Sequence, residues 1–151
     1  MTSPIPTYYR IAFLLIDPIF AAIGVYYNTF NPHWVLNSYT PNAKLPATET
    51  TMLLDSATGF VLGIMYLQLV FLRHRQSDLG AWRAVQASIL TVDVVLVAAY
   101  IRAFIADNRL DFSQLRLDDW TNLAITGGVA LNRAAFLLGI GIHDKGKGKV
   151  A

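Results

Sequence analysis

Four long runs of apolar residues cross the chain, and shorter polar segments separate them. The runs extend over about 10–28, 51–72, 84–106 and 121–142 of the 151 residues. A helix needs roughly 20 residues to cross the hydrocarbon core of a bilayer, and all four runs approach that length. The pattern therefore predicts an all-α integral membrane protein, built as a single four-helix bundle domain.

The polar and small residues between and within these runs predict local features. Residues 29–50 are rich in Pro, Asn and Thr, which predicts an irregular loop over one end of the bundle, with Trp34 and Tyr39 at the membrane interface. Pro18 predicts a kink in the first helix because it has no backbone N–H. Small residues favour close helix packing, which we expect at Gly24, Gly59, Gly63, Gly127, Gly128, Gly139 and Gly141.

Basic residues are distributed unevenly between the two sides of the four predicted spans. One side carries Arg10, Arg73, Arg75, Arg83, Lys145, Lys147 and Lys149, whereas the other carries Lys44, Arg109 and Arg116 among several aspartates. The positive-inside rule then places both termini in the cytosol. An odd number of spans would scatter these charges, so their distribution also supports four spans.

The composition agrees with a membrane protein and narrows the chemistry. Hydrophobic residues make up 54% of the chain and charged residues 15%, whereas soluble domains are nearer a quarter charged. The absence of cysteine excludes a disulfide framework, a thiol nucleophile and a thiolate metal site. All three histidines lie at or beyond the ends of the runs, so we expect no metal and no cofactor. The basic excess suits anionic lipid headgroups, which makes the lipid bilayer the expected partner and not a nucleic acid.

The C-terminal tail carries Lys147 and Lys149, at the fifth and third positions from the end of the chain. This spacing resembles the dilysine retrieval signal of endoplasmic-reticulum membrane proteins, which a receptor reads on the cytosolic side. A solvated basic tail or the remnant of an expression tag would have the same composition. We predict a location in the endoplasmic-reticulum membrane, with these alternatives open.

Ionisable residues lie deep inside three of the predicted spans. Asp17 interrupts the first run, Asp93 the third, and Arg133 follows Asn132 in the fourth. At a helix rise of about 1.5 Å per residue, all four reach a similar depth. A charge at that depth costs at least a few kcal/mol, so it usually marks a functional site. We expect these four side chains to converge in one layer inside the bundle, as catalytic residues.

Further polar and aromatic residues are expected to bind a substrate beside this layer. The candidates are Tyr66, Gln68, Asp55, Tyr100 and Phe60. Asp55 also belongs to a shallower set with Glu49, Tyr100 and Arg102, where it would pair with Arg102 or line the mouth of a cavity.

The main alternative to a functional layer is a structural ion pair between Arg133 and Asp93. Two deep aspartates share one deep arginine, however, so a simple ion pair would leave one carboxylate without a cationic partner. This excess carboxylate favours a functional site. Asp17 has an explanation of its own, because an Asp-Pro pair often caps or breaks a helix.

Two carboxylates, a guanidinium and a carboxamide in an apolar pocket are suited to activating water. We expect Asp93 to act as the base, with Asn132 orienting it, and Asp17 as the acid. A carboxyl that is near a like charge and away from water keeps its proton at neutral pH, and Arg133 would keep the two in different protonation states. Such a layer can open an epoxide by water or by an internal hydroxyl. It can also protonate an alkene and stabilise a carbocation with aromatic faces.

Several short motifs together resemble a family of small four-span fungal membrane proteins that are encoded beside biosynthetic genes. The motifs are Tyr9-Arg10, Phe13-Leu14, Asp17-Pro18, Pro32 to Leu36, Asp93, and Asn132-Arg133-Ala134-Ala135-Phe136-Leu137 before Gly139. The family includes hydrolases of the aurovertin and citreoviridin pathways, which are assigned to opening polyene epoxides. The resemblance implies the same activity here, with Asp17, Asp93, Asn132 and Arg133 at the site.

The architecture is also remotely similar to the emopamil-binding (EXPERA) family of sterol isomerases and lipid-binding proteins, although the buried His of that family is missing here. We therefore predict an enzyme that opens an epoxide on an apolar polyene or terpenoid. The alternatives are a sterol-type isomerase or terpene cyclase, and a lipid-binding protein without catalysis. The sequence leaves open the substrate, the stereochemistry and whether the chain forms a homo-oligomer.

Overall fold

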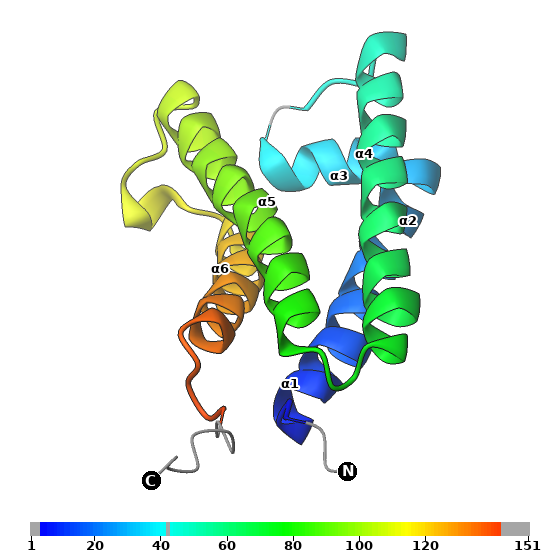
Figure 1. Ribbon diagram of the computed structural model, residues 1–151. Helices are drawn as coiled ribbons and strands as arrows, with labels where there is room; N and C mark the ends of the chain where they lie inside the picture. The colour runs from blue at the N-terminus through cyan, green and yellow to red at the C-terminus, as the bar shows by residue number, and fades with distance from the viewer. Residues whose placement is uncertain (1–3, 42, 143–151) are drawn as a thin grey trace, which may run out of the picture.

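The computed structural model describes residues 4–41 and 43–142, and this part of the chain is all-α (Figure 1). Lys147 and Lys149 of the predicted retrieval signal lie outside the described residues. The elements are α1 (Thr7–Ile11), the π-helix η1 (Ala12–Ile16), α2 (Asp17–Phe30), α3 (Pro32–Tyr39), α4 (Thr48–Tyr66), the π-helix η2 (Leu67–Leu72), α5 (Leu79–Ala106), the 3₁₀-helix η3 (Phe112–Gln114) and α6 (Leu117–Leu137).

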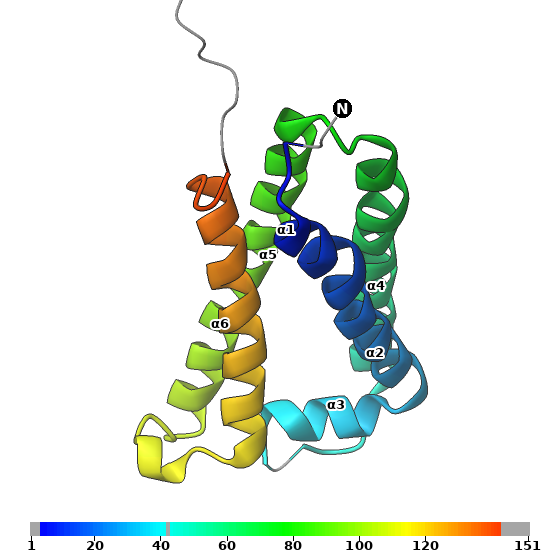
Figure 2. The same ribbon diagram turned by 90° about the horizontal axis from the view of Figure 1, so that it is seen from below.

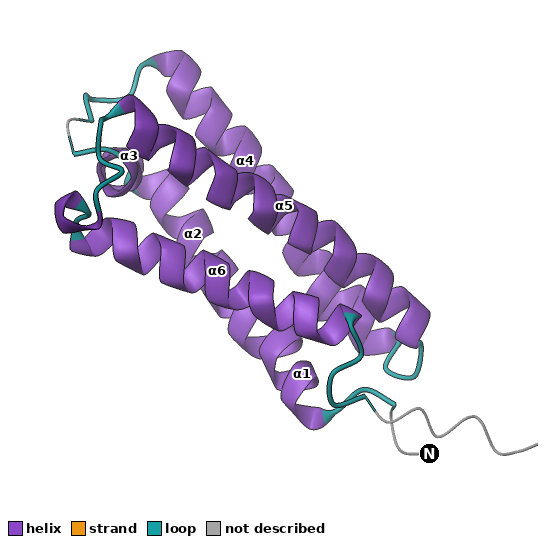
Figure 3. Cartoon of the chain, turned by 90° about the vertical axis from the view of Figure 1, so that its left-hand side faces the viewer, coloured by secondary structure: helices purple, strands orange, loops and turns teal. Residues whose placement is uncertain are grey.

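The long helices are arranged as two pairs, with α2 packed against α4 and α5 packed against α6. The pairs meet beside α1 and diverge toward the other end, where α3 lies across the gap and contacts both α2 and α6 (Figure 2). Seen from the side, the long helices run alongside one another and α3 crosses them (Figure 3). The hydroxyl of Tyr9 donates a hydrogen bond of 2.9 Å to the carbonyl of Ile140, so the described chain begins and ends at the same end of the bundle.

Three helices are long and apolar enough to cross a membrane: Thr7–Phe30, Thr48–Leu72 and Leu79–Ala106. They indicate a multi-pass membrane protein, and many of their large apolar side chains are exposed on the outer surface. The fourth predicted span corresponds to α6, a helix of 21 residues that is more polar than the other three. Its first turn carries acidic residues, and its C-terminal third carries Asn132 and Arg133. Four spans and cytosolic termini therefore remain predictions.

Local structure differs from the sequence-based prediction at three places. The last helix ends at Leu137 and not near 142, because Gly139 and Gly141 have φ angles of +78° and +74° and so leave the helical region. Part of the predicted irregular loop forms α3, which begins with Pro32 at a position where proline is favourable. The turn directly before Asp17 and Pro18 is the π-helix η1, a widened turn that was not predicted beside the expected kink.

The prediction of close helix packing at the glycines is wrong for those inside the helices. A Cβ atom added at Gly24, Gly59, Gly63, Gly127 or Gly128 would meet no atom within 4 Å. No neighbouring atom in the described part of this chain therefore requires glycine at these positions.

Aromatic side chains form the core where the two helix pairs meet. Phe13, Trp82 and Phe136 are completely buried, and Tyr9 packs at their edge. The ring centroids of Phe13 and Phe136 are 5.4 Å apart, and those of Tyr9 and Phe136 are 5.0 Å apart, both edge-to-face. Such pairs contribute about 0.5–1.5 kcal/mol each beyond burial. The core therefore fixes the first helix against α5 and α6 one turn below the predicted polar layer.

The topology can be tested with single cysteines, because the chain contains none of its own. Ser77 lies in the exposed connection between η2 and α5, and the exposed Ser113 lies in η3 at the opposite end. If the termini are cytosolic, a membrane-impermeant maleimide should label Ser77→Cys in sealed microsomes. It should label Ser113→Cys only after detergent is added. Labelling of Ser113→Cys in intact microsomes would contradict the predicted orientation.

Candidate functional site

Arg133 of α6 lies between two carboxylates that come from different helices. Its Nη2 donates a hydrogen bond of 2.6 Å to Oδ2 of Asp17 on α2, and its Nη1 donates to Oδ2 of Asp93 on α5. The three residues are only 4–8% exposed. The structure thus brings together the two deep aspartates and the deep arginine that the sequence singled out.

Two glutamines complete this polar layer, which consists of Asp17, Gln68, Gln86, Asp93 and Arg133. Gln68 of η2 donates from Nε2 to Oδ2 of Asp17 at 3.2 Å, and Arg133 donates from Nε to Oε1 of Gln86 at 3.2 Å. Both glutamines are completely buried or nearly so. Gln86 was missed by the sequence analysis, although it precedes Asp93 by seven residues, two helical turns, and so shares its face of α5.

Asn132 does not take the place that the sequence analysis gave it. It makes no hydrogen bond to the polar layer and is not among the residues that line the cavity described below. Successive helical residues point about 100° apart, so Asn132 cannot share the direction of Arg133. Gln68 and Gln86 supply the carboxamides of the layer instead.

Two π-helical turns lie beside the polar layer. Asp17 directly follows η1, and Gln68 lies within η2. A π-turn contains an extra residue, changes the direction of the following side chains and is frequent at functional sites. Pro18 provides a local cause for η1, because it cannot donate to the preceding turn. The apolar residues of η2 give no comparable signal in the sequence.

A cavity of about 400 Å³ extends from the polar layer to α3. Its inner end is formed by Asp17, Gln68, Asp93 and Arg133, and the aromatic core lies on the other side of this layer. Its walls are mainly apolar and come from the four long helices: Phe20, Ile23, Val61, Ile64, Val92, Leu96, Ile125 and Val129. Small-molecule sites commonly have volumes of about 300–1,000 Å³, so the cavity is large enough for a ligand.

Phenol and amide groups border the other end of the cavity, beneath α3. Tyr39 and Tyr100 lie there with ring centroids 5.6 Å apart, next to Ser38 and Asn122. Burial, with the neighbouring Tyr100 adding to it, raises the pKa of the Tyr39 phenol to about 12. This end of the cavity is therefore polar but uncharged.

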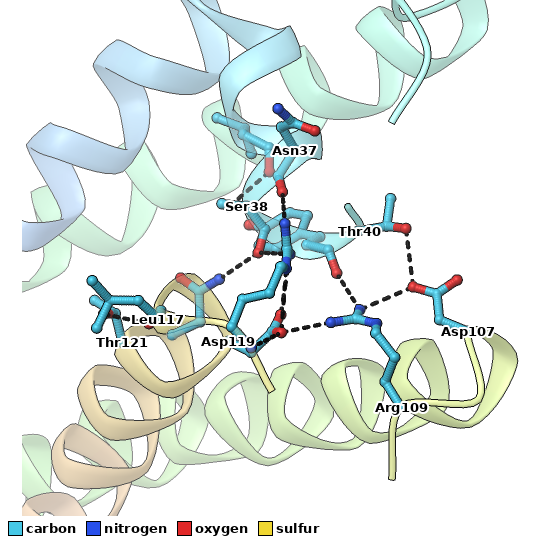
Figure 4. Close-up of polar contacts among 12 residues, drawn as sticks. Asn37, Ser38, Thr40, Asp107, Arg109, Leu117, Asp119 and Thr121 are labelled. Atoms are coloured by element: carbon cyan, nitrogen blue, oxygen red, sulfur yellow. Dashed lines mark hydrogen bonds and ion pairs between the residues drawn. The ribbon is translucent and has the colours of Figure 1, made fainter. Parts of the chain in front are cut away.

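Two arginines donate hydrogen bonds to the carbonyl groups at the C-terminal end of α3 (Figure 4). Arg109 lies in the segment between α5 and α6, and Arg116 directly precedes α6. Arg116 donates to the carbonyls of Asn37 at 2.9 Å and Ser38 at 3.2 Å, and Arg109 donates to that of Tyr39 at 3.3 Å. The last carbonyls of a helix have no partner within it and carry partial negative charge, so cationic donors stabilise them. This α3 clamp fixes the helix over the cavity.

Asp119 positions both arginines of the clamp. It is 1% exposed and accepts from Arg109 at 2.5 Å and from Arg116 at 3.1 Å. Arg109 also donates to Asp107 at 2.9 Å, and this hydrogen bond lowers the pKa of the Asp107 carboxyl. The sequence analysis had treated these residues only as loop charges, because no local pattern shows that α3 folds back onto them.

The remaining sequence-based candidates divide into two groups. Gln68 and Tyr100 line the cavity. Tyr66 and Phe60 are 63% and 76% exposed on the outer surface, and Asp55 is also exposed; none of these three lines the cavity. Within the described residues, Asp55 forms no ion pair with Arg102 and does not line the cavity, so neither of the two alternatives for Asp55 is observed. These positions on α4 point away from the bundle because only one face of the helix packs against α2.

The α3 clamp predicts a large stability difference between two adjacent aspartates. Asp119→Ala leaves two arginines without their shared carboxylate, and loss of one partner of a buried pair costs about 3–5 kcal/mol. Asp118→Ala is the matched control, because Asp118 is exposed in the same helical turn. A thermal-unfolding assay in detergent should show a melting temperature several degrees lower for Asp119→Ala only. Equal melting temperatures would show that the clamp contributes little.

No curated protein matches the chain, and no solved structure matches it either. One family model does match, over residues 2–143, and it describes a domain of unknown function. The match covers the described helices from α1 to α6, including every residue of the polar layer and of the α3 clamp. The chain therefore belongs to the DUF7704 family.

Proposed function

We propose that this protein is an acid–base enzyme of the endoplasmic-reticulum membrane that opens an epoxide on an apolar polyene or terpenoid. The observation that carries the proposal is the Asp17–Arg133–Asp93 group at the inner end of an apolar cavity. Two carboxylates that share one guanidinium carry an excess negative charge, and burial favours a layer in which one of them keeps a proton. One acid and one base are then available at the same place.

The hydrogen bonds favour a division of roles opposite to the sequence-based one. Among the described residues, Oδ2 of Asp17 accepts from both Gln68 and Arg133, whereas Oδ2 of Asp93 accepts from Arg133 alone. Donors to a carboxylate stabilise its ionised form, so Asp17 is the carboxyl that is ionised and can take the role of the base. Asp93 is then the acid that keeps its proton until the substrate oxygen needs it.

The reaction needs only water and these residues. Asp17 takes a proton from a water molecule as the water oxygen bonds to one epoxide carbon. The bond from that carbon to the epoxide oxygen breaks, and Asp93 donates its proton to this oxygen, which gives a diol. A hydroxyl group of the substrate can replace the water and gives a cyclic ether. A cavity water then returns the proton from Asp17 to Asp93, with Arg133 compensating the charge throughout.

The proposal predicts that both aspartates are needed for turnover. Asp17→Asn and Asp93→Asn should each lower the rate on the order of a hundredfold or more, the usual effect of losing a general acid or base. Asn keeps the shape and still accepts from Arg133, so both variants should fold. Asn132→Ala is the control in the same turn and should retain activity. The measurement is mass spectrometry of membranes supplied with polyene and terpenoid epoxides.

A second candidate reaction is alkene protonation, as in a sterol-type isomerase or terpene cyclase. The stacked rings of Tyr27 and Trp34, with centroids 4.3 Å apart, line the same cavity. Aromatic faces stabilise a cation that passes over them. The same Asp93 proton would then be delivered to carbon and not to oxygen.

Isotope labelling distinguishes these reactions. With hydrolysis, the product formed in heavy-oxygen water should contain one heavy oxygen, because water supplies the new hydroxyl. Cyclisation by an internal hydroxyl should incorporate none. Alkene isomerisation should incorporate deuterium at carbon from heavy water, which epoxide opening should not. A protein that binds these substrates but converts none of them would be a lipid-binding protein with a structural polar layer.

A further inference from the structure

The α3 end of the cavity contains hydrogen-bonding groups that the proposed chemistry does not use. Tyr39 and Tyr100 border the cavity there, on α3 and α5. Asn122 of α6 donates one amide hydrogen to the carbonyl of Ser38 at 3.1 Å. No protein donor reaches its side-chain oxygen within residues 4–41 and 43–142. Polar groups in an otherwise apolar cavity fix the orientation of a ligand.

The charges near this end are occupied elsewhere. Arg109 and Arg116 donate to α3 carbonyls and to Asp119, and neither lines the cavity. The Tyr39 phenol stays neutral at physiological pH. An anionic head group would therefore lose its hydration here without gaining a cation, which is costly. A hydroxyl or carbonyl group, in contrast, would find both donors and acceptors.

The distance between the two polar ends follows from the helices. Asp93 and Tyr100 are seven residues apart on α5, which corresponds to about 10 Å at the helical rise. Apolar residues of the walls lie between these levels: Leu96 on α5, and Ile125 and Val129 on α6, which separate Asn122 from Arg133. A molecule that fills the cavity must therefore be elongated and apolar along its middle.

We propose that Tyr39, Tyr100 and Asn122 form a subsite for a neutral hydroxyl or carbonyl head group. The ligand would be an elongated apolar molecule whose far end reaches the Asp17–Arg133–Asp93 group. The placement of its epoxide at that far end rests on the proposed function. The recognition of the head group does not, so binding can be measured without turnover.

The test compares three probes of equal chain length: dodecanol, dodecane and dodecanoate. Binding is measured by equilibrium dialysis to the purified full-length protein in phosphatidylcholine nanodiscs, with empty nanodiscs subtracted. The wild type should bind dodecanol on the order of tenfold more tightly than dodecane, as one or two net hydrogen bonds would give. Dodecanoate should bind more weakly than dodecanol. The double variant Tyr39→Phe/Tyr100→Phe keeps both rings and should bind dodecanol and dodecane alike.

Two control variants separate this subsite from the proposed reaction. Tyr66→Phe removes the hydroxyl of an exposed tyrosine on α4 and should keep the preference for dodecanol. Asp93→Asn should lose epoxide turnover but also keep that preference. The subsite is refuted if the wild type binds dodecanol and dodecane equally, if the preference survives in the double variant, or if dodecanoate binds best. A tyrosine-dependent preference without any epoxide turnover would refute the proposed function and support the subsite.

Discussion

A guanidinium inside a membrane bundle must have both counter-charge and hydrogen-bond acceptors, because neither water nor lipid can supply them at that depth. Arg133 obtains them from three side chains: Asp17, Asp93 and Gln86. The acceptors come from two other helices, so α6 can occupy only one register against α2 and α5. A slip of a single residue would turn Arg133 by about 100° and leave Arg133, Asp93 and Gln86 without the hydrogen bonds that join them.

This constraint also explains the shape of the molecule. The polar layer and the aromatic core join the helix pairs at one end, and Phe136 follows Arg133 by about one turn of α6. Within the described residues, no second layer of this kind joins the pairs toward α3, where their ribbons diverge (Figure 2). The side chains of both pairs border the cavity there. The helix α3 closes the gap because its C-terminal carbonyls bind Arg109 and Arg116. One ionic network, the polar layer, thus forms the inner end of the cavity. The other, the α3 clamp, holds the helix that closes the opposite end.

The sequence predicts those features that depend on one helix at a time. Apolar length identifies the long helices, and the cost of a buried charge identifies Asp17, Asp93 and Arg133 as residues that face inward. Which face of each helix points inward depends on neighbours far away in the chain. Asn132 was therefore grouped wrongly with Arg133, and Tyr66, Phe60 and Asp55 were placed in a cavity from which they point away. Gln86 was missed because its partner Arg133 lies 47 residues away in the sequence. The α3 clamp was missed because its arginines bind carbonyl groups that lie 70 or more residues away, although their acidic partners Asp107 and Asp119 are close in the sequence.

A purely structural ion pair would be most stable with packed side chains on every side. Empty space beside a buried charge removes packing contacts and supplies no hydrogen-bond partner in return. The polar layer has aromatic packing on one side only. On its other side Asp17, Asp93 and Arg133 border the cavity, so both carboxylates lie where a ligand can reach them. In the part of the chain that the structure describes, each carboxylate accepts hydrogen bonds through its Oδ2 atom only, Asp17 from Arg133 and Gln68 and Asp93 from Arg133. The second oxygen of each remains available to a water or a substrate, which a binding and proton-transfer site requires and an ion pair that only joins helices does not.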